Sequence, residues 1–122
     1  MPGKTVLIVD DEKDVATVLK ARLASLGYNA ICAYDGEEGL KLAKEKKPDA
    51  IFLDIMMPKV DGISVVLKLK ADHDTRAIPV VMLSGIKQAE EKAVTKSLGV
   101  AHYITKPYDK DEIIAVLKQM FG

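Results

Sequence analysis

The chain has 122 residues, and its 18 basic and 18 acidic side chains give a formal net charge of zero. That balance argues against a nucleic-acid surface, which needs excess basic charge facing phosphates. The longest uncharged run, residues 23–34, is too short and too polar to span a bilayer. A single cysteine cannot form an internal disulfide. We therefore expect a soluble, cytoplasmic protein with one domain over residues 1–122 and no direct contact with nucleic acid or membrane.

Short apolar runs alternate along the chain with longer charged segments. The apolar runs, which we expect to be strands, are 5–9, 30–33, 50–53, 80–83 and 101–105. The first, third and fourth runs have no polar alternation, which is typical of parallel strands covered on both faces. The intervening segments, expected to be helices, are 14–26, 35–46, 62–71, 87–98 and 109–121.

The first and last of these helices show the clearest amphipathic pattern. The apolar stripe of the first is formed by Val15, Val18, Leu19, Leu23 and Leu26. That of the last is formed by Ile113, Ile114, Val116, Leu117 and Met120. Gly27 and Gly99 directly follow two helical segments, as is common at helix C-termini. Strict alternation of strand and helix predicts a (βα)₅ fold, an open, doubly wound α/β sheet of five parallel strands.

In such sheets the binding crevice lies beyond the carboxyl ends of the strands. The first expected strand is followed by Asp10 and Asp11, the third by Asp54, the fourth by Ser84 and the fifth by Lys106. Three carboxylates at one edge would repel one another unless a cation joined them. Oxygen ligands favour a hard ion, and Mg²⁺ suits a site with few carboxylates, water and a phosphate oxygen. The pattern therefore favours metal-assisted phosphoryl chemistry on a carboxylate.

The same residues resemble the receiver domains of two-component response regulators, and the length resembles the stand-alone, chemotaxis-type members. The matching motifs are residues 6–12, 49–54, 57–58 with 61–62, 79–85 and 103–107. They fall in order over nearly the whole chain. The resemblance implies a flavodoxin-like sheet with strand order 2-1-3-4-5. It also implies a phosphoacceptor signalling domain that catalyses only its own phosphorylation and dephosphorylation.

For the acidic motif residues, the resemblance implies an acceptor and its metal ligands. Asp54 would take a phosphoryl group from a phosphohistidine on a histidine kinase or phosphotransfer protein. Asp11 would bind Mg²⁺ directly, and Asp10 through water. The backbone carbonyl of Met56 would be a further ligand.

The remaining motif residues would bind the phosphoryl group or respond to it. Lys106 would pair first with Asp54 and then with the phosphoryl oxygens, and its peptide bond to Pro107 would be cis. Gly85 would leave room for the phosphate. Ser84 would bond the phosphoryl group, and Tyr103 would follow it inward as the switch aromatic, altering the face formed by the fourth helix, fifth strand and fifth helix for a downstream protein. A monomer or a weak phosphorylation-dependent dimer is expected.

Met56 and Ile86 stand two residues after Asp54 and Ser84, positions that flank the path of hydrolytic water in this family. Both are apolar here, where chemotaxis regulators have polar residues. We hypothesise that neither side chain can orient water, so that the aspartyl phosphate is long-lived. The alternative is that both side chains only pack against each other.

Plainer interpretations exist for single residues. Asp11 or Asp54 alone could cap a helix, and Tyr103 alone could be a half-buried strand residue. Among whole-protein alternatives, a haloacid-dehalogenase-type phosphatase would need a second acid where Met56 stands. A flavin-binding module would need a hydroxyl- and glycine-rich phosphate loop after the first strand, where the largely acidic segment 10–14 would repel phosphate. A pure interaction domain, or the receiver of a longer regulator or hybrid kinase, stays open.

Overall fold

The structure, a computed structural model, describes residues 3–55, 57, 62–84, 93, 95–105 and 109–122. The strands are β1 (Thr5–Val9), β2 (Asn29–Ala33), β3 (Ala50–Asp54), β4 (Val80–Ser84) and β5 (His102–Thr105). The described helices are α1 (Lys13–Ser25), α2 (Gly36–Lys46), α3 (Gly62–Ala71) and α5 (Lys110–Phe121). Most of the helix predicted over 87–98 lies outside the described residues, of which 93 and 95–97 are helical. The elements otherwise match the predicted ones to within one residue at each end.

All five strands are parallel and follow the order β2-β1-β3-β4-β5. The predicted α/β class, parallel sheet and 2-1-3-4-5 order are therefore confirmed. The register places Val9 of β1 opposite Leu53 of β3, and Asp54 opposite Leu83 of β4. The carboxyl ends of the three central strands are thus level with one another, which is the arrangement a site at this edge requires.

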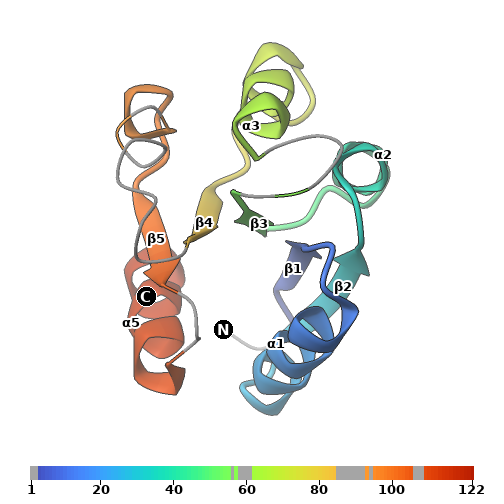
Figure 1. Ribbon diagram of the computed structural model, residues 1–122. Coiled ribbons are helices and arrows are strands. Elements are labelled where there is room, and N and C mark those ends of the chain that lie inside the picture. The colour runs from blue at the N-terminus through green and yellow to red at the C-terminus, as the bar shows by residue number, and fades with distance from the viewer. Residues whose placement is uncertain (1–2, 56, 58–61, 85–92, 94, 106–108) are drawn as a thin grey trace.

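Helices cover both faces of the sheet, with α1 and α5 on one side and α2 and α3 on the other (Figure 1). Successive residues of β1 alternate between the two cores: Leu7 and Val9 pack toward α2 and α3, whereas Val6 and Ile8 pack toward α1 and α5. Burial of one such side chain stabilises the fold by about 1.5–3 kcal/mol. Two-sided burial explains why the β1, β3 and β4 sequences are apolar without alternation.

Gly27 ends α1 as the sequence predicts. Its φ is +93°, and its N–H donates to the Ala24 carbonyl while the N–H of Tyr28 donates to that of Leu23. This pair of bonds is the Schellman motif, in which a left-handed residue satisfies the last helical carbonyls. Gly99, with φ +96°, ends the helical residues 95–97 with the same bond pattern.

The predicted apolar stripe of α1 is wrong in one member. Ala16, Leu19 and Leu23 are buried, but the side chain of Val18 is 52% exposed. Positions 16, 19 and 23 recur at three- and four-residue intervals and define one face, and residue 18 points about 100° away from its neighbour Leu19. In α5 the prediction succeeds at its centre, since Ile113, Val116 and Leu117 are buried.

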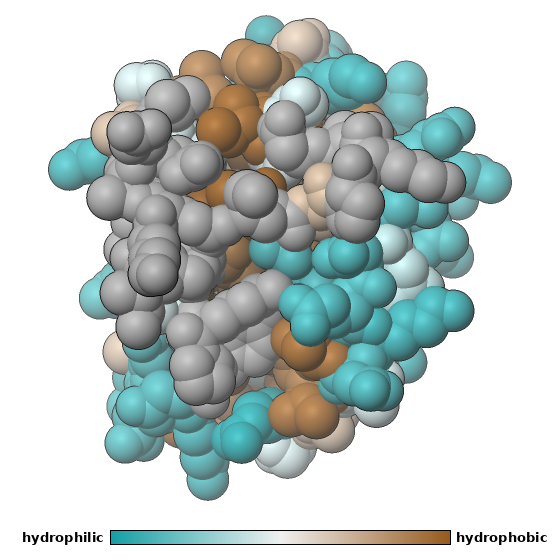
Figure 2. Space-filling view, in the orientation of Figure 1, coloured by the Kyte–Doolittle hydropathy of each residue, from teal (hydrophilic) through white to brown (hydrophobic). Residues whose placement is uncertain are grey.

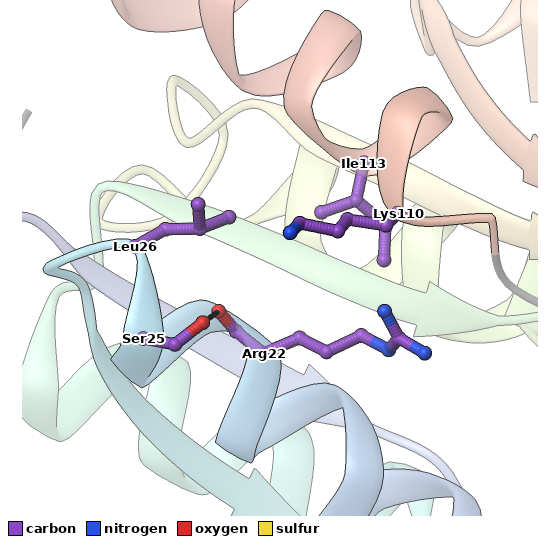
Figure 3. A pocket seen from close by; sticks show the side chains of 5 residues that line it. All are labelled: Arg22, Ser25, Leu26, Lys110 and Ile113. Atoms are coloured by element: carbon purple, nitrogen blue, oxygen red, sulfur yellow. Dashed lines mark hydrogen bonds between the residues drawn. The ribbon is translucent and has the colours of Figure 1, made fainter.

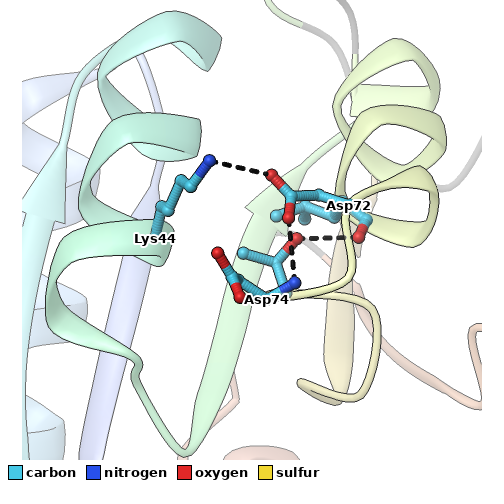
Figure 4. A network of polar contacts seen from close by, with 5 residues as sticks. Lys44, Asp72 and Asp74 are labelled. Carbon is cyan, nitrogen blue, oxygen red and sulfur yellow. Dashed lines mark hydrogen bonds and ion pairs between the residues drawn. The ribbon is translucent and has the colours of Figure 1, made fainter.

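An ion pair joins α2 to the turn that follows α3 (Figure 4). Lys44 Nζ lies 3.5 Å from Asp72 Oδ2, and the other carboxylate oxygen of Asp72 accepts from the Asp74 N–H. That backbone bond, opposed by desolvation and helped by Lys44, lowers the pKa of Asp72. The stabilisation is therefore present above the carboxyl's ordinary pKa and is lost as the pH falls through its folded-state value. Both groups are exposed, so the contribution is small.

On the face shown in Figure 2, hydrophilic residues occupy most of the outer rim of the described surface. The exposed large apolar side chains of the described residues are Val18, Tyr34 and Leu67. None of the helices in the described part of the chain combines the length and apolar character needed to cross a bilayer.

Candidate functional site

Two buried carboxylates lie at the carboxyl edge of the sheet. Asp54 ends β3 with a side chain only 3% exposed, and Asp10 follows β1 and is fully buried. Because Val9 and Leu53 are in register, the residues after them lie side by side. The predicted convergence of Asp10 and Asp54 on this edge is therefore what the structure shows.

The third carboxylate of the cluster belongs to Glu12. One oxygen from each of Asp10, Glu12 and Asp54 lies within 4.8 Å of the other two. The Glu12 N–H also donates to Asp10 Oδ1 at 3.0 Å, and Glu12 occupies the N-cap position of α1. The turn from β1 into α1 thus folds the Glu12 carboxylate back over the strand end.

Asp11, the predicted direct metal ligand, is half-buried and is not a member of this cluster. Ser84 ends β4 and pairs in register with Thr105, one position beyond the Leu83–Asp54 pair. The structure therefore places the Ser84 backbone at the acidic edge, and the position of its side chain is not described. The other predicted site residues, which lie outside the described residues, are Met56, Gly85, Ile86, Lys106 and Pro107.

Gly62 packs against the backbone of Asp54 and Ile55. A Cβ atom at this position would come within 2.5 Å of the Asp54 carbonyl oxygen and 2.7 Å of the Ile55 Cα. The Gly62 N–H donates to the Ile55 carbonyl at 2.7 Å. The first residue of α3 therefore lies directly against the backbone that carries Asp54. In the sequence this glycine is only part of a motif, and nothing local shows which backbone it contacts.

Tyr103, the predicted switch aromatic, is half-buried in β5, and its hydroxyl points to the start of that strand. The hydroxyl oxygens of Tyr103 and Thr95 are 2.9 Å apart, and the Tyr103 hydroxyl donates to the Val100 carbonyl at 3.3 Å. Thr95 is fully buried. The tyrosine hydroxyl is therefore bonded toward Thr95 and Val100, away from the strand end where Ser84 lies.

A pocket of about 120 Å³ lies between the last turn of α1 and the first turn of α5 (Figure 3). Arg22 and Lys110 line it together with Ser25, Leu26 and Ile113. It contains none of the predicted site residues. This pocket is therefore separate from the acidic cluster.

Cys32 is half-buried in β2, with its Sγ 3.9 Å from the Ala16 carbonyl oxygen. Burial raises the pKa of its thiol, with Lys20 acting in the opposite direction. A thiol with a raised pKa is a poor nucleophile at neutral pH.

The electrostatics of the cluster favour a cation. Two unit negative charges about 5 Å apart repel by on the order of 3 kcal/mol at an effective dielectric constant of about 20. The three oxygens of Asp10, Glu12 and Asp54 are hard donors at a spacing that one divalent ion can bridge. Buried carboxylates that share a cation can then act on an anionic substrate such as a phosphoryl group, which they would otherwise repel.

The fold and this edge define a doubly wound α/β domain with an acidic, oxygen-only site. The family model described as "Response regulator receiver domain" matches residues 6–118. The chain belongs to that family, and the predicted membership of the two-component receiver domains is confirmed.

Curated relatives agree with this assignment. The chain is 41% identical over 116 residues to the alkaline phosphatase synthesis transcriptional regulatory protein PhoP of Bacillus subtilis, covering 95% of this chain and 48% of that protein. It is 37% identical over 115 residues to the DNA-binding dual master transcriptional regulator RpaA of Synechocystis, covering 94% and 48%. The chain thus spans about half the length of these relatives.

Solved structures show the same fold. The chemotaxis protein CheY4 of Vibrio cholerae is 26% identical with a TM-score of 0.90, over 98% of this chain and 99% of that one. The receiver domain of sensor histidine kinase PA1611 from Pseudomonas aeruginosa is 28% identical with a TM-score of 0.87, over 97% of both chains. That structure has a magnesium ion coordinated in its active-site cleft.

Proposed function

We propose that Asp54 accepts a phosphoryl group from a phosphohistidine on a histidine kinase or a phosphotransfer protein. The observation that carries this is the burial of Asp54 at the carboxyl end of β3, with a carboxylate oxygen within 4.8 Å of those of Asp10 and Glu12. Family membership supports the same role. The domain is a signalling acceptor that acts on itself, and not a turnover enzyme.

In the transfer step an Asp54 carboxylate oxygen attacks phosphorus and forms an acyl–phosphate bond. The phosphorus–nitrogen bond of the phosphohistidine breaks, and its electron pair stays on the imidazole nitrogen, which takes up a proton. Asp54 is held in place because β3 is paired on both sides, by β1 and β4. Lys106, directly after β5, contributes a positive charge for the phosphoryl oxygens.

Asp10, Asp11 and Asp54 are proposed to hold Mg²⁺, with the Met56 carbonyl as a further ligand. Bound there, the ion would neutralise charge on the transferring phosphoryl group. Glu12 lies in the same oxygen cluster but is exposed. We therefore assign it to the water-mediated shell, since ordering a long exposed side chain costs conformational entropy.

Magnesium should stabilise the domain. At about 100 times its dissociation constant, a ligand specific for the folded state adds about 2.7 kcal/mol to the free energy of unfolding. We expect urea unfolding to show this increase for the natural chain, and Asp11→Asn to weaken Mg²⁺ binding about tenfold or more. Glu12→Gln is the matched variant and should change the affinity little. A larger loss of Mg²⁺ affinity for Glu12→Gln than for Asp11→Asn would show that Glu12, and not Asp11, is the direct ligand.

The experiment that tests the function is incubation with a small phosphodonor such as phosphoramidate in the presence of Mg²⁺. Intact mass should show one phosphoryl group per chain, removed by hydroxylamine, as an acyl phosphate requires. A chelator should prevent its incorporation. Labelling that survives hydroxylamine, or that needs no divalent ion, would contradict the proposal. Continuous release of phosphate from small esters would support the phosphatase alternative instead.

Phosphorylation is proposed to act on a partner through Ser84 and Tyr103. Added charge at the acidic edge would draw the Ser84 hydroxyl toward it, and Tyr103 would turn inward, shifting an existing equilibrium of the fourth helix, β5 and α5. The described state has the Tyr103 hydroxyl bonded to Thr95 and Val100. Inward rotation would therefore break these two hydrogen bonds and move the tyrosine ring toward Ser84.

The apolar residues Met56 and Ile86 are proposed to lengthen the lifetime of the aspartyl phosphate. The double variant Met56→Asn/Ile86→Glu supplies two polar groups that can orient water. We expect its phosphoryl group to decay about tenfold faster, within the range that a positioned general acid or base contributes. The measurement is loss of hydroxylamine-sensitive label after removal of the donor. Met56→Leu/Ile86→Leu is the apolar control, and equal decay in all three proteins would refute the hypothesis.

The chain spans about half the length of its curated relatives, so the downstream function of the whole protein is proposed separately. We propose a cytoplasmic receiver that is monomeric or dimerises weakly on phosphorylation and that signals to a protein. In a longer regulator, contact with DNA would belong to another segment, since the net charge of this one is zero.

A further inference from the structure

A side chain of α5 holds the end of β5. Glu112 Oε1 accepts a hydrogen bond from the Thr105 backbone N–H at 2.6 Å, and both residues are half-buried. Within the described ranges β5 is an edge strand of the sheet, with β4 as its one neighbour. An edge strand has backbone donors with no neighbouring strand to accept them. The Glu112 carboxylate serves as that acceptor at the last residue of the strand.

This use of Glu112 differs from what the local sequence would indicate. Asp109 is the N-cap of α5, and a glutamate three residues after the cap commonly returns to the cap's own N–H as a capping box. Here Asp109 caps the helix by accepting from the Asp111 N–H at 2.9 Å, and Glu112 contacts Thr105 of β5. The carboxylate thus joins two elements across the connection between them.

The turn of α5 that carries Glu112 is held by core packing and by a backbone hydrogen bond. The next residue, Ile113, is 1% exposed and belongs to the core cluster that contains Ile104 of β5. The Ile113 N–H donates to the Asp109 carbonyl at 3.1 Å, so this turn of α5 is closed. A charge-assisted bond from a fixed helix to a backbone N–H is short and directional. It therefore constrains the backbone of Thr105.

Thr105 is the residue before Lys106 and the register partner of Ser84. Because a peptide bond joins Thr105 to Lys106, a constraint on the Thr105 backbone also constrains the backbone at Lys106. We infer that Glu112 is a positioning residue for phosphoryl transfer, acting through the Thr105 N–H on the direction of Lys106. This inference rests on the proposed function, in which Lys106 pairs with Asp54 and the phosphoryl group.

The kinetic test compares four proteins: the natural chain, Glu112→Ala, Glu112→Gln and Asp111→Ala. Asp111 is exposed in the same helical turn and carries the same charge. We expect Glu112→Ala to slow phosphorylation by phosphoramidate about tenfold, as small misplacements of a catalytic group do. Mg²⁺ affinity should not change. Glu112→Gln, which keeps the acceptor, should retain most of the rate, and Asp111→Ala all of it.

A double-variant cycle shows whether the effect passes through Lys106. On a Lys106→Ala background, Glu112→Ala should add no further loss, because the group it positions is gone. A further tenfold loss on that background, or equal rates for Glu112→Ala and Asp111→Ala, would overturn the inference.

A structural readout separates this inference from the proposed function. Glu112→Ala should speed hydrogen exchange at the Thr105 amide and move the ¹³C resonance of reductively methylated Lys106. Asp111→Ala should do neither. An unchanged Lys106 resonance in Glu112→Ala would refute the positioning role. Failure of the natural chain to take up phosphate would count against the proposed function alone, because these resonances are measured without phosphate.

Discussion

Asp54→Asn is expected to reduce phosphorylation by a small phosphodonor with Mg²⁺ to background. The amide keeps the shape of the side chain at the end of β3 but removes the nucleophilic carboxylate. It also removes one of the negative charges clustered with Asp10 and Glu12. The stabilisation by Mg²⁺, about 2.7 kcal/mol for the natural chain at about 100 times the dissociation constant, should therefore be largely lost in this variant.

Intact mass after phosphoramidate treatment measures the first effect, and urea unfolding with and without Mg²⁺ measures the second. Asp35→Asn is the matched control because Asp35 caps α2 by accepting from the Glu38 N–H, a role that asparagine also fills. This control should be labelled like the natural chain. Hydroxylamine-sensitive labelling that persists in Asp54→Asn would show that another residue is the acceptor.

Gly62→Ala is expected to destabilise the fold and to damage the site together. The added methyl group would meet the Asp54 carbonyl oxygen at 2.5 Å and the Ile55 Cα at 2.7 Å, and backbone atoms cannot move aside as a flexible side chain can. Overpacking of this kind costs about 1–3 kcal/mol, occasionally more. Without the clash, alanine would stabilise a helix by up to about 1 kcal/mol relative to glycine. A decrease in the free energy of unfolding would therefore indicate the clash, and an increase would indicate its absence.

Gly99→Ala separates the clash from general destabilisation. Gly99 has φ +96°, but a Cβ atom there has nothing within 4 Å. Its cost is backbone strain of about 1–2 kcal/mol. Urea unfolding should show a loss for both variants, whereas Mg²⁺ affinity and phosphorylation should fall only for Gly62→Ala. A Gly62→Ala protein as stable as the natural chain, or one with normal Mg²⁺ affinity, would contradict the packing described for α3.

The local patterns of the chain were sufficient to predict most of the fold. The apolar runs of β1, β3 and β4 predict strands buried on both faces, and Gly27 predicts the end of α1 through its left-handed conformation. The prediction was wrong at Val18, because the sequence does not distinguish an apolar residue beside the buried face of a helix from one within that face. The pattern of apolar residues shows that a helix has a buried face, but it does not define which residues at the border of that face are buried.

The acidic site could be predicted in part. Asp10 and Asp54 follow strands whose carboxyl ends meet, so topology alone brings them together. The third member of the carboxylate cluster is different: Glu12 joins it, whereas Asp11 was expected. Both residues are acidic and adjacent to the same strand end, and only the turn into α1 decides which carboxylate folds back over it.

By itself, the sequence determined the order and type of the elements and the strand ends at which chemistry-bearing residues stand, because both follow from short-range periodicity and parallel topology. Only the tertiary structure decided the long-range contacts at the site: Gly62 against the backbone of Asp54, and Glu112 on the Thr105 N–H in place of its own helix cap. These contacts depend on how helices settle on the sheet and which way a carboxylate turns, and neither leaves a periodic signal in the chain.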